Sequence, residues 1–448
     1  MEQGELTSQQ LLEHLLGRID QHNERGAGLR AIVEINPDAM ALARQFDAER
    51  AAGKVRGPLH GIPVVLKDNI GTADRLQTAA GSLALVGPPA PGDAAVVVNL
   101  RAAGALVLGK SNMSEWANFR GSNIPNGWSG RGGHTLSPYG AEFDACGSST
   151  GSAVALAAGF VPAAVGTETT GSIICPAANN GVVGIKPTLG LLSNLGIVPL
   201  SARQDTPGPM ARNVTDAAVL LAGMQSDPAL LGQYLVAINS ANLRGKRIGV
   251  PAEYAEGVGL VNDNPLFAQA LAAMRRAGAQ LIPVSPRVAP SYDEMYVLLH
   301  EFKAAIPVYL QSRPGLGVGS LSDVIRFNGS HPGHPDYNQF WLETAQAWEM
   351  SEEDYAQTLE RMVRLNRTAL DTPFAQHNLH ALAFPAAFSS WSMAARAGYP
   401  NITVPAGLSE QGLPGGISFV GQANSETQLL ALAAAYEALV PPSTCVSR

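Results

Sequence analysis

Residues Ile62-Pro63-Val64-Val65-Leu66 form an unbroken apolar run that ends directly before Lys67. A short apolar run of this kind, rich in β-branched residues, predicts a buried strand. Asp93 predicts the N-terminal cap of a helix that ends near Gly104, and residues 105–108 predict a second strand. This order of strand, helix and strand is typical of an α/β sheet with crossover helices.

The same alternation returns later in the chain. Residues 247–250 and 281–284 predict two strands, and Asn264-Pro265 predicts the start of a helix between them that ends near Ala277. From residue 288 to 376 the sequence becomes richer in aromatic and charged residues, which indicates a helical insertion rather than more sheet. The fold class expected from this pattern is α/β.

Two helices are expected to open the chain. Thr7 followed by Gln10 has the pattern of a capping box ahead of an amphipathic stretch. Asn36-Pro37 predicts an N-cap with proline at the first helical position, before a helix over residues 39–49. At the other end, residues 427–440 carry leucines at helical spacing, which predicts a helix that packs on the core.

Composition excludes several classes of protein. The 448 residues include 37 acidic and 30 basic ones, which gives a net charge of −7, and no run of five like charges occurs. Nucleic acid and anionic membranes are therefore not expected as partners. No apolar run is long enough to span a bilayer. Three cysteines cannot form a disulfide framework, and the acidic start does not resemble a signal peptide, so we expect a reducing, cytoplasmic location.

Glycine and serine concentrate in two turns, Gly147-Ser148-Ser149-Thr150-Gly151-Ser152 and Gly166-Thr167-Glu168-Thr169-Thr170-Gly171-Ser172-Ile173. Glycine allows close approach of the backbone to a ligand, as needed to present a serine beside free N–H donors. Lys67 lies at the end of an apolar strand. Desolvation there can lower the pKa of a lysine toward neutrality and make it a general base.

Residues 147–151 also match G-x-S-x-G, the nucleophile elbow of the α/β-hydrolases. That alternative makes Ser149 the nucleophile of an esterase, with His300 or His377 as its base. The elbow should directly follow a buried strand, yet residues 139–145 are not a hydrophobic run. The sequence therefore disfavours this alternative without removing it.

Taken together, Lys67 in GIPVVLKDN, the segment GSSTGSA at 147–153 and the segment GTETTGSI at 166–173 resemble the amidase signature family of serine hydrolases. Their order and the spacing between the serines agree with that family, and further blocks extend the resemblance from about residue 5 to 440. Cys146 and the segment Ser172-Ile173-Ile174-Cys175-Pro176 are similar to the bacterial peptide amidases. The fold implied is one large domain, residues 1–448, with a mixed central sheet flanked by helices and a substrate-facing insertion near 288–376.

The resemblance also implies the chemistry: hydrolysis of linear amides, including peptide amides, through an acyl-enzyme. Ser172 would be the nucleophile, Ser148 a bridging serine after a cis peptide bond, and Lys67 the base. The backbone N–H groups of Thr169, Thr170, Gly171 and Ser172 would form the oxyanion hole. No cofactor is implied, the expected partner is a small amide or carbamate, and the chain is expected to be a monomer or homodimer.

Two departures from the family pattern concern the substrate. Thr170 stands where the commonest form has glycine and the peptide amidases have aspartate, so we expect an acidic group to be missing beside the oxyanion loop. This would favour anilides or aryl carbamates, as in an aryl acylamidase or urethanase. Ile174 replaces an arginine, which weakens the alternative of an amidotransferase subunit that depends on partner chains.

The close histidine pairs are His331 with His334 and His377 with His380. They lie in loop-like sequence without a nearby cysteine, so metal binding is not expected there.

Overall fold

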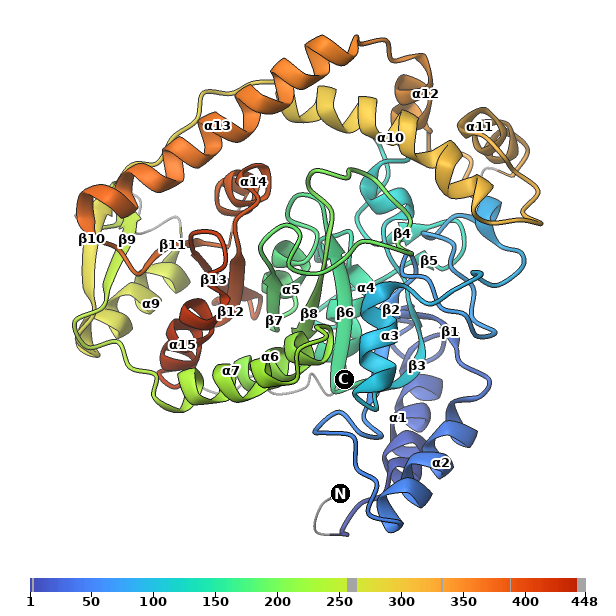
Figure 1. Ribbon diagram of the computed structural model, residues 1–448, viewed down its shortest axis with the longest axis horizontal. Coiled ribbons are helices and arrows are strands. Elements are labelled where there is room, and N and C mark those ends of the chain that lie inside the picture. Colours follow the sequence, from blue (N-terminus) through green and yellow to red (C-terminus); the bar gives the residue numbers. More distant parts are fainter. Residues whose placement is uncertain (2–3, 256–263, 332, 387, 441–448) are drawn as a thin grey trace.

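The computed structural model describes residues 1, 4–255, 264–331, 333–386 and 388–440. Within these residues, eleven strands form one sheet in the order β1-β3-β2-β6-β8-β7-β12-β13-β11-β9-β10 (Figure 1). The strands are β1 (Ile32–Ile35), β2 (Pro63–Lys67), β3 (Leu106–Ser111), β6 (Ala163–Glu168), β7 (Val183–Lys186), β8 (Thr206–Ala211), β9 (Arg247–Pro251), β10 (Gln280–Val284), β11 (Ala381–Pro385), β12 (Asn401–Leu408) and β13 (Pro414–Val420). A separate pair consists of β4 (Trp128–Ser129) and β5 (Gly133–His134).

The large sheet is mixed. Strand β2 pairs parallel with both β3 and β6, and β9 pairs parallel with β10 and β11. Between these two parts, β8, β7, β12 and β13 connect by antiparallel pairing. The mixed central sheet flanked by helices, predicted from the resemblance, is therefore confirmed.

Helices cover both faces of the sheet. Side chains alternate along β2: Val64 and Leu66 join one core cluster, and Val65 joins another on the opposite face. The first face is covered by α3 (Ala95–Ala102), α6 (Val214–Gly223), α7 (Ala229–Asn239), α9 (Pro265–Arg276) and α15 (Glu426–Glu437), and the second by α1 (Ser8–His22), α2 (Ala39–Ala51) and α4 (Thr150–Ala157). Every residue of α4 is buried, so this helix lies inside the core.

Four helices fill most of residues 288–376 and arch over the sheet in Figure 1. They are α10 (Asp293–Gln311), α11 (Leu321–Ser330), α12 (Phe340–Ala347) and α13 (Glu352–His377). Phe302 and Ile306 of α10 share a core cluster with Trp116 and Phe119, which lie in and beside the short 3-10 helix Glu115–Asn118. The insertion is thus packed against loops at one edge of the sheet. The remaining helices are α5 (Ile174–Asn179), α8 (Ala252–Ala255) and α14 (Phe388–Ala397), with a second 3-10 turn at Leu83–Leu85.

Of the helix starts predicted from the sequence, two are confirmed and two are wrong. Thr7 and Gln10 form the capping box of α1, and Asn264 caps α9 with Pro265 at its start. By contrast, α2 and α3 begin without a side-chain cap. The Asn36 side chain donates to the carbonyl of Val107 and accepts from the Asp38 N–H, which precedes α2, and Asp93 accepts from the Ala73 N–H.

Candidate active site

The three predicted catalytic residues come from segments that meet at one edge of the sheet. Lys67 is the last residue of β2, and Ser148 lies two residues before α4. Ser172 lies between the end of β6 and the start of α5. Because β2 and β6 are parallel neighbours, their carboxyl ends lie side by side. The structure therefore brings together segments that are about one hundred residues apart.

Lys67 is fully buried and is held at three points. Its Nζ donates to Ser148 Oγ at 2.7 Å, to Ser149 Oγ at 3.0 Å and to the carbonyl oxygen of Thr167 at 3.0 Å. Burial lowers the pKa of Lys67 to about 7, although the carboxylates of Asp205 and Glu168 oppose this shift. A large fraction of this lysine is therefore neutral near neutral pH.

The two serine-bearing segments are in direct contact. The Ser149 N–H donates to the carbonyl oxygen of Ser172 at 3.1 Å, and the peptide bond between Gly147 and Ser148 is cis. Ser148 is fully buried, whereas Ser172 is 6% exposed. In the described chain, the hydroxyl groups of Ser148 and Ser172 do not form a hydrogen bond with each other. Such catalytic contacts commonly tighten only when substrate binds.

The hydroxyl group of Ser149 is buried and forms hydrogen bonds within the core. Its hydroxyl donates to the carbonyl oxygen of Thr167 and accepts from Lys67 and from the Thr167 N–H. Residues 139–147, which precede it, contain no strand, and His300 pairs with Glu352 at 3.3 Å. This geometry does not support Ser149 as the nucleophile of an elbow.

The predicted oxyanion loop, residues 169–172, has backbone donors that face no described acceptor. The N–H groups of Thr169, Thr170 and Ser172 form no hydrogen bond with another described residue. The Gly171 N–H instead faces the buried carboxylate of Glu168, which also accepts from the Ile173 and Ile174 N–H groups. Three of the four predicted donors are thus free to act together.

Gly171 meets a steric and a conformational requirement. Its φ is +77°, and a β-carbon there would lie 2.6 Å from Nε1 of Trp391. Only glycine fits both the backbone and the indole of α14 at this point. The loop is therefore enclosed on one side by Trp391.

Acidic groups lie against this loop, contrary to the expectation drawn from Thr170. The Thr170 hydroxyl donates to Glu294 of α10, and Gln204 Nε2 donates to the same hydroxyl at 2.9 Å. Asp205 accepts from the Thr169 hydroxyl at 2.6 Å, and burial raises the pKa of Asp205 to about 6. The expectation fails because Glu294 is 124 residues away in sequence and reaches the loop only through the packing of the insertion.

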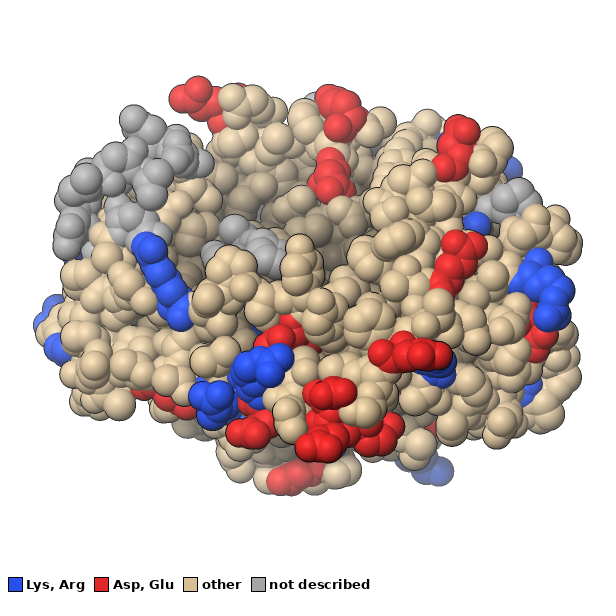
Figure 2. All heavy atoms as spheres, turned by 90° about the horizontal axis from the view of Figure 1, so that it is seen from above, with Lys and Arg blue, Asp and Glu red and all other residues tan. Residues whose placement is uncertain are grey.

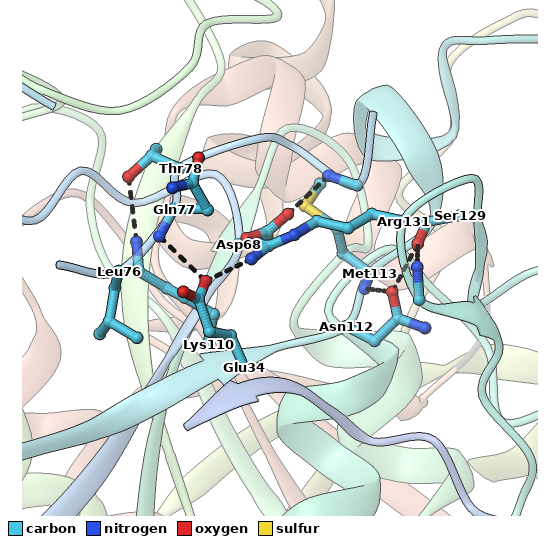
Figure 3. Close-up of polar contacts among 12 residues, drawn as sticks. Glu34, Asp68, Leu76, Gln77, Thr78, Lys110, Asn112, Met113, Ser129 and Arg131 are labelled. Atoms are coloured by element: carbon cyan, nitrogen blue, oxygen red, sulfur yellow. Dashed lines mark hydrogen bonds and ion pairs between the residues drawn. The ribbon is translucent and has the colours of Figure 1, made fainter. Parts of the chain in front are cut away.

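Lys110 is a second buried lysine, one strand away (Figure 3). Its Nζ donates to Thr78 Oγ1 at 3.1 Å and to the carbonyl oxygen of Ile70, and no serine hydroxyl is among its partners in the described chain. Burial lowers its pKa to about 8. Nearby, Arg131 joins the carboxylates of Asp68 and Glu34. This cluster joins β1 to Asp68, the residue that follows Lys67, and no serine hydroxyl contacts Lys110 among the residues that the structure describes.

Cys146 and Cys175 form a disulfide bond. The sequence argument that cysteines in so long a chain stay reduced is wrong for this pair, so the cysteine count does not indicate a reducing compartment. The bond connects the residue before Gly147-Ser148 to α5, which begins two residues after Ser172. It therefore ties the two serine-bearing segments together.

Two adjoining cavities lie near the end of β6, and the outer one is lined in part by the insertion. The inner cavity is lined by polar residues that include Thr167, Thr169 and Asp205 and by apolar residues that include Met113 and Trp116. The outer groove, of about 980 Å³, is lined by α10 and α13, and it shares Asn194, Ile197 and Pro199 with the inner cavity. Thr169 is the residue of the predicted oxyanion loop that lines the inner cavity, and the outer groove is lined by none of residues 169–172.

The molecular surface carries charges of both signs. On the face seen in Figure 2, lysine and arginine are scattered among acidic and uncharged side chains, and the face is hollowed near its middle. None of the described helices is long and apolar enough to cross a membrane. Among the described residues, no group of three histidine, cysteine or acidic side chains is arranged to hold a metal ion. His331 and His334 instead stack on Phe327 and Tyr337.

The Amidase family model matches residues 10–430 of this chain. The chain belongs to the amidase family. A probable amidase of Arabidopsis thaliana is 38% identical to this amidase, over 96% of this chain and 86% of the relative. A glutamyl-tRNA(Gln) amidotransferase component of Ralstonia pickettii is 32% identical, over 97% of this chain and 94% of the relative.

Among solved structures, the native peptide amidase of Stenotrophomonas maltophilia superimposes on this amidase with a TM-score of 0.91 at 43% identity. The superposition covers 99% of this chain and 96% of that one. The resemblance to the family that the sequence indicated is therefore confirmed.

Proposed function

We propose that this amidase hydrolyses linear amides through an acyl-enzyme, with Lys67 as base, Ser148 as proton relay and Ser172 as nucleophile. The observation that carries the proposal is the contact of 2.7 Å between the buried Lys67 Nζ and Ser148 Oγ. A lysine with a pKa of about 7 can accept a proton from a serine hydroxyl at neutral pH.

In the acylation step, neutral Lys67 takes the hydroxyl proton of Ser148 while Ser148 takes that of Ser172. Ser172 Oγ then bonds to the carbonyl carbon of the amide, and the carbonyl oxygen becomes an oxyanion beside the N–H groups of Thr169, Thr170 and Ser172. When the C–N bond breaks, Ser148 gives a proton to the leaving nitrogen and recovers one from Lys67. Water then attacks the ester by the same relay, releasing the carboxylic acid and free Ser172.

Peptide C-terminal amides are the substrate class we propose first. The 43% identity with a peptide amidase supports this choice. The second candidates, aryl acylamides and carbamates, would use the same relay. Their main support was the absence of an acidic group at Thr170, and the contact between Thr170 and Glu294 removes that support.

An amidotransferase subunit is a third candidate, because such subunits are among the relatives of this chain. Ile174, in the place where the family's commonest form has arginine, speaks against it. We propose a chain that acts on its own, as monomer or homodimer. Turnover of a simple amide by the isolated chain would distinguish the two.

The test is a panel of substrates that share one acyl group and differ in the leaving group: a peptide C-terminal amide, the matching anilide and the matching aryl carbamate. The expected result is the highest kcat/KM for the peptide amide, with Ser172→Ala inactive on all three. Preference for the anilide or carbamate would change the substrate class, and no turnover of any amide would overturn the proposed function.

A further inference from the structure

We propose that Glu294 is a positioning residue of this enzyme, which fixes the oxyanion loop from the insertion. The proposal rests on the proposed function, because it concerns the loop that would stabilise the oxyanion. It adds a residue that the proposed relay does not include.

The first observation is that the Glu294 carboxylate is fully occupied. One oxygen accepts from the Thr170 hydroxyl and from Gln204 Nε2, the latter at 2.8 Å. The other accepts from Arg396 Nε at 2.9 Å and Nη2 at 2.6 Å. Two hydrogen bonds from one guanidinium fix the direction of the carboxylate. Glu294 therefore holds Thr170 and leaves no oxygen for the substrate.

The second observation is where the partners come from. Glu294 lies in the first turn of α10, and Arg396 lies near the end of α14. The same helix α14 carries Trp391, whose indole lies against Gly171. The Glu294 and Arg396 side chains are only 14% and 20% exposed, so this ion pair is largely shielded from solvent. Two helices thus hold the oxyanion loop at adjacent residues, Thr170 and Gly171.

The consequence concerns the transition state. The Thr170 and Ser172 N–H groups can stabilise an oxyanion only when their direction is fixed before the reaction. Loss of the Glu294 contact would leave the Thr170 hydroxyl held by Gln204 alone and let the loop move. Displacement of a catalytic group by about 1 Å can lower a rate about 100-fold. We therefore expect kcat to fall while KM changes little.

Asp293 supplies a matched control. It is the neighbour of Glu294 in the same helical turn, and it forms a bidentate pair with Arg361 of α13, at 2.9 Å and 2.8 Å. Asp293→Asn and Glu294→Ala each remove one ion pair that anchors α10, but only Glu294 contacts the oxyanion loop. A purely structural role would make the two variants behave alike.

The experiment measures three quantities on wild type, Glu294→Ala, Glu294→Gln and Asp293→Asn. They are kcat and KM for a peptide C-terminal amide, the rate at which a fluorophosphonate probe labels Ser172, and Tm. The probe reports the nucleophile and the oxyanion hole without a known substrate. Glu294→Ala should lower kcat and the labelling rate about 10- to 100-fold, with KM within about threefold. Glu294→Gln keeps an acceptor for Thr170 and should recover part of the loss.

Asp293→Asn should lower Tm yet keep the labelling rate within about twofold of wild type. The double variant Thr170→Val, Glu294→Ala should have a labelling rate no lower than that of the slower single variant. Each single change already removes the same contact between Thr170 and Glu294. An unchanged labelling rate in Glu294→Ala, or an equal loss in Asp293→Asn, would overturn the proposal. If the wild type is labelled at Ser172 but hydrolyses no amide, the proposed function fails and the labelling rates still decide the role of Glu294. Failure of the probe to label Ser172 in the wild type would overturn both.

Discussion

At the scale of single residues, two buried lysines on neighbouring strands differ in what their amino groups contact. Lys67 Nζ donates to two serine hydroxyls, whereas Lys110 Nζ donates to Thr78 and a carbonyl oxygen. Burial lowers the pKa of both lysines. A lowered pKa alone does not make a lysine a catalytic base. The amino group must also contact the hydroxyl of the nucleophile or of its proton relay, from which it takes the proton.

The pH dependence of activity follows from Lys67. Its pKa is lowered to about 7 by burial, and in the proposed relay the neutral form is the base, so kcat/KM should rise about tenfold per pH unit below 7 and level off above it. Lys67→Arg should be inactive at every pH, because an arginine in a protein does not lose its proton. The check is a pH profile of kcat/KM for both proteins. Activity in the arginine variant would show that Lys67 is only a structural charge.

The serines can be separated by substitution. Ser172→Ala removes the oxygen that attacks in the proposed mechanism and little volume, so kcat should fall by about 10⁴-fold or more while the fold is kept. Ser149→Ala should keep measurable activity. It leaves a buried N–H of Thr167 without its partner, which should lower the free energy of unfolding by about 1–3 kcal/mol. The opposite pattern, with Ser149 essential and Ser172 dispensable, would restore the nucleophile elbow.

Which site residues the sequence could predict depends on how they are brought to the site. Lys67, Ser148 and Ser172 lie in short motifs, so their order along the chain was enough to nominate them. Asp205 begins a segment that also resembles a family block, but nothing in the sequence indicated that it accepts from Thr169. Glu294 could not be found, because its approach to Thr170 depends on how α10 packs across the sheet.

At the scale of elements, apolar runs were a better guide than capping residues. The apolar run at 62–66 correctly predicted β2, which lies one residue later in the chain. This prediction succeeds because the apolar composition of a short segment is itself what favours a buried strand. Asn36 and Asp93 have the side chains of N-caps, yet neither accepts from the first turn of the helix that follows: Asn36 binds Val107 and the Asp38 N–H, and Asp93 binds the Ala73 N–H. A polar side chain satisfies whichever partner the tertiary structure offers, so local rules are weaker for caps than for strands.

The connection of β1, β2 and the loop after β4 depends on Arg131. It pairs with Glu34 of β1 and with the fully buried Asp68, which follows Lys67 (Figure 3). Arg131→Met leaves a buried carboxylate without its cation, so the free energy of unfolding should fall by about 3–5 kcal/mol. The control is Arg75→Met, which breaks the exposed pair with Asp38. Urea unfolding curves that shift equally for both variants would contradict the importance of burial.

At the scale of the whole molecule, the insertion and the sheet contribute to one site. The sheet supplies Lys67 and the loop that carries Ser172, and the helices α10 and α14 supply Glu294 and Trp391. The outer groove lies against the same insertion. Changes in α10 should therefore alter turnover as well as substrate preference, because this helix both lines the groove and contacts the predicted oxyanion loop through Glu294.

The disulfide between Cys146 and Cys175 closes a loop with a sequence separation of 29 residues, which includes α4 and β6. Closing a loop of this length should stabilise the protein by about 3–4 kcal/mol through the entropy of the unfolded chain. A reductant should therefore lower the urea midpoint of the wild type and leave that of the Cys146→Ala, Cys175→Ala double variant unchanged. The double variant should match the reduced wild type. Titration of thiols in the unfolded, unreduced wild type should find one, because two of the three cysteines are paired. Three reactive thiols and a midpoint insensitive to reductant would show that the pair is reduced in solution and does not stabilise the arrangement of the two serine segments.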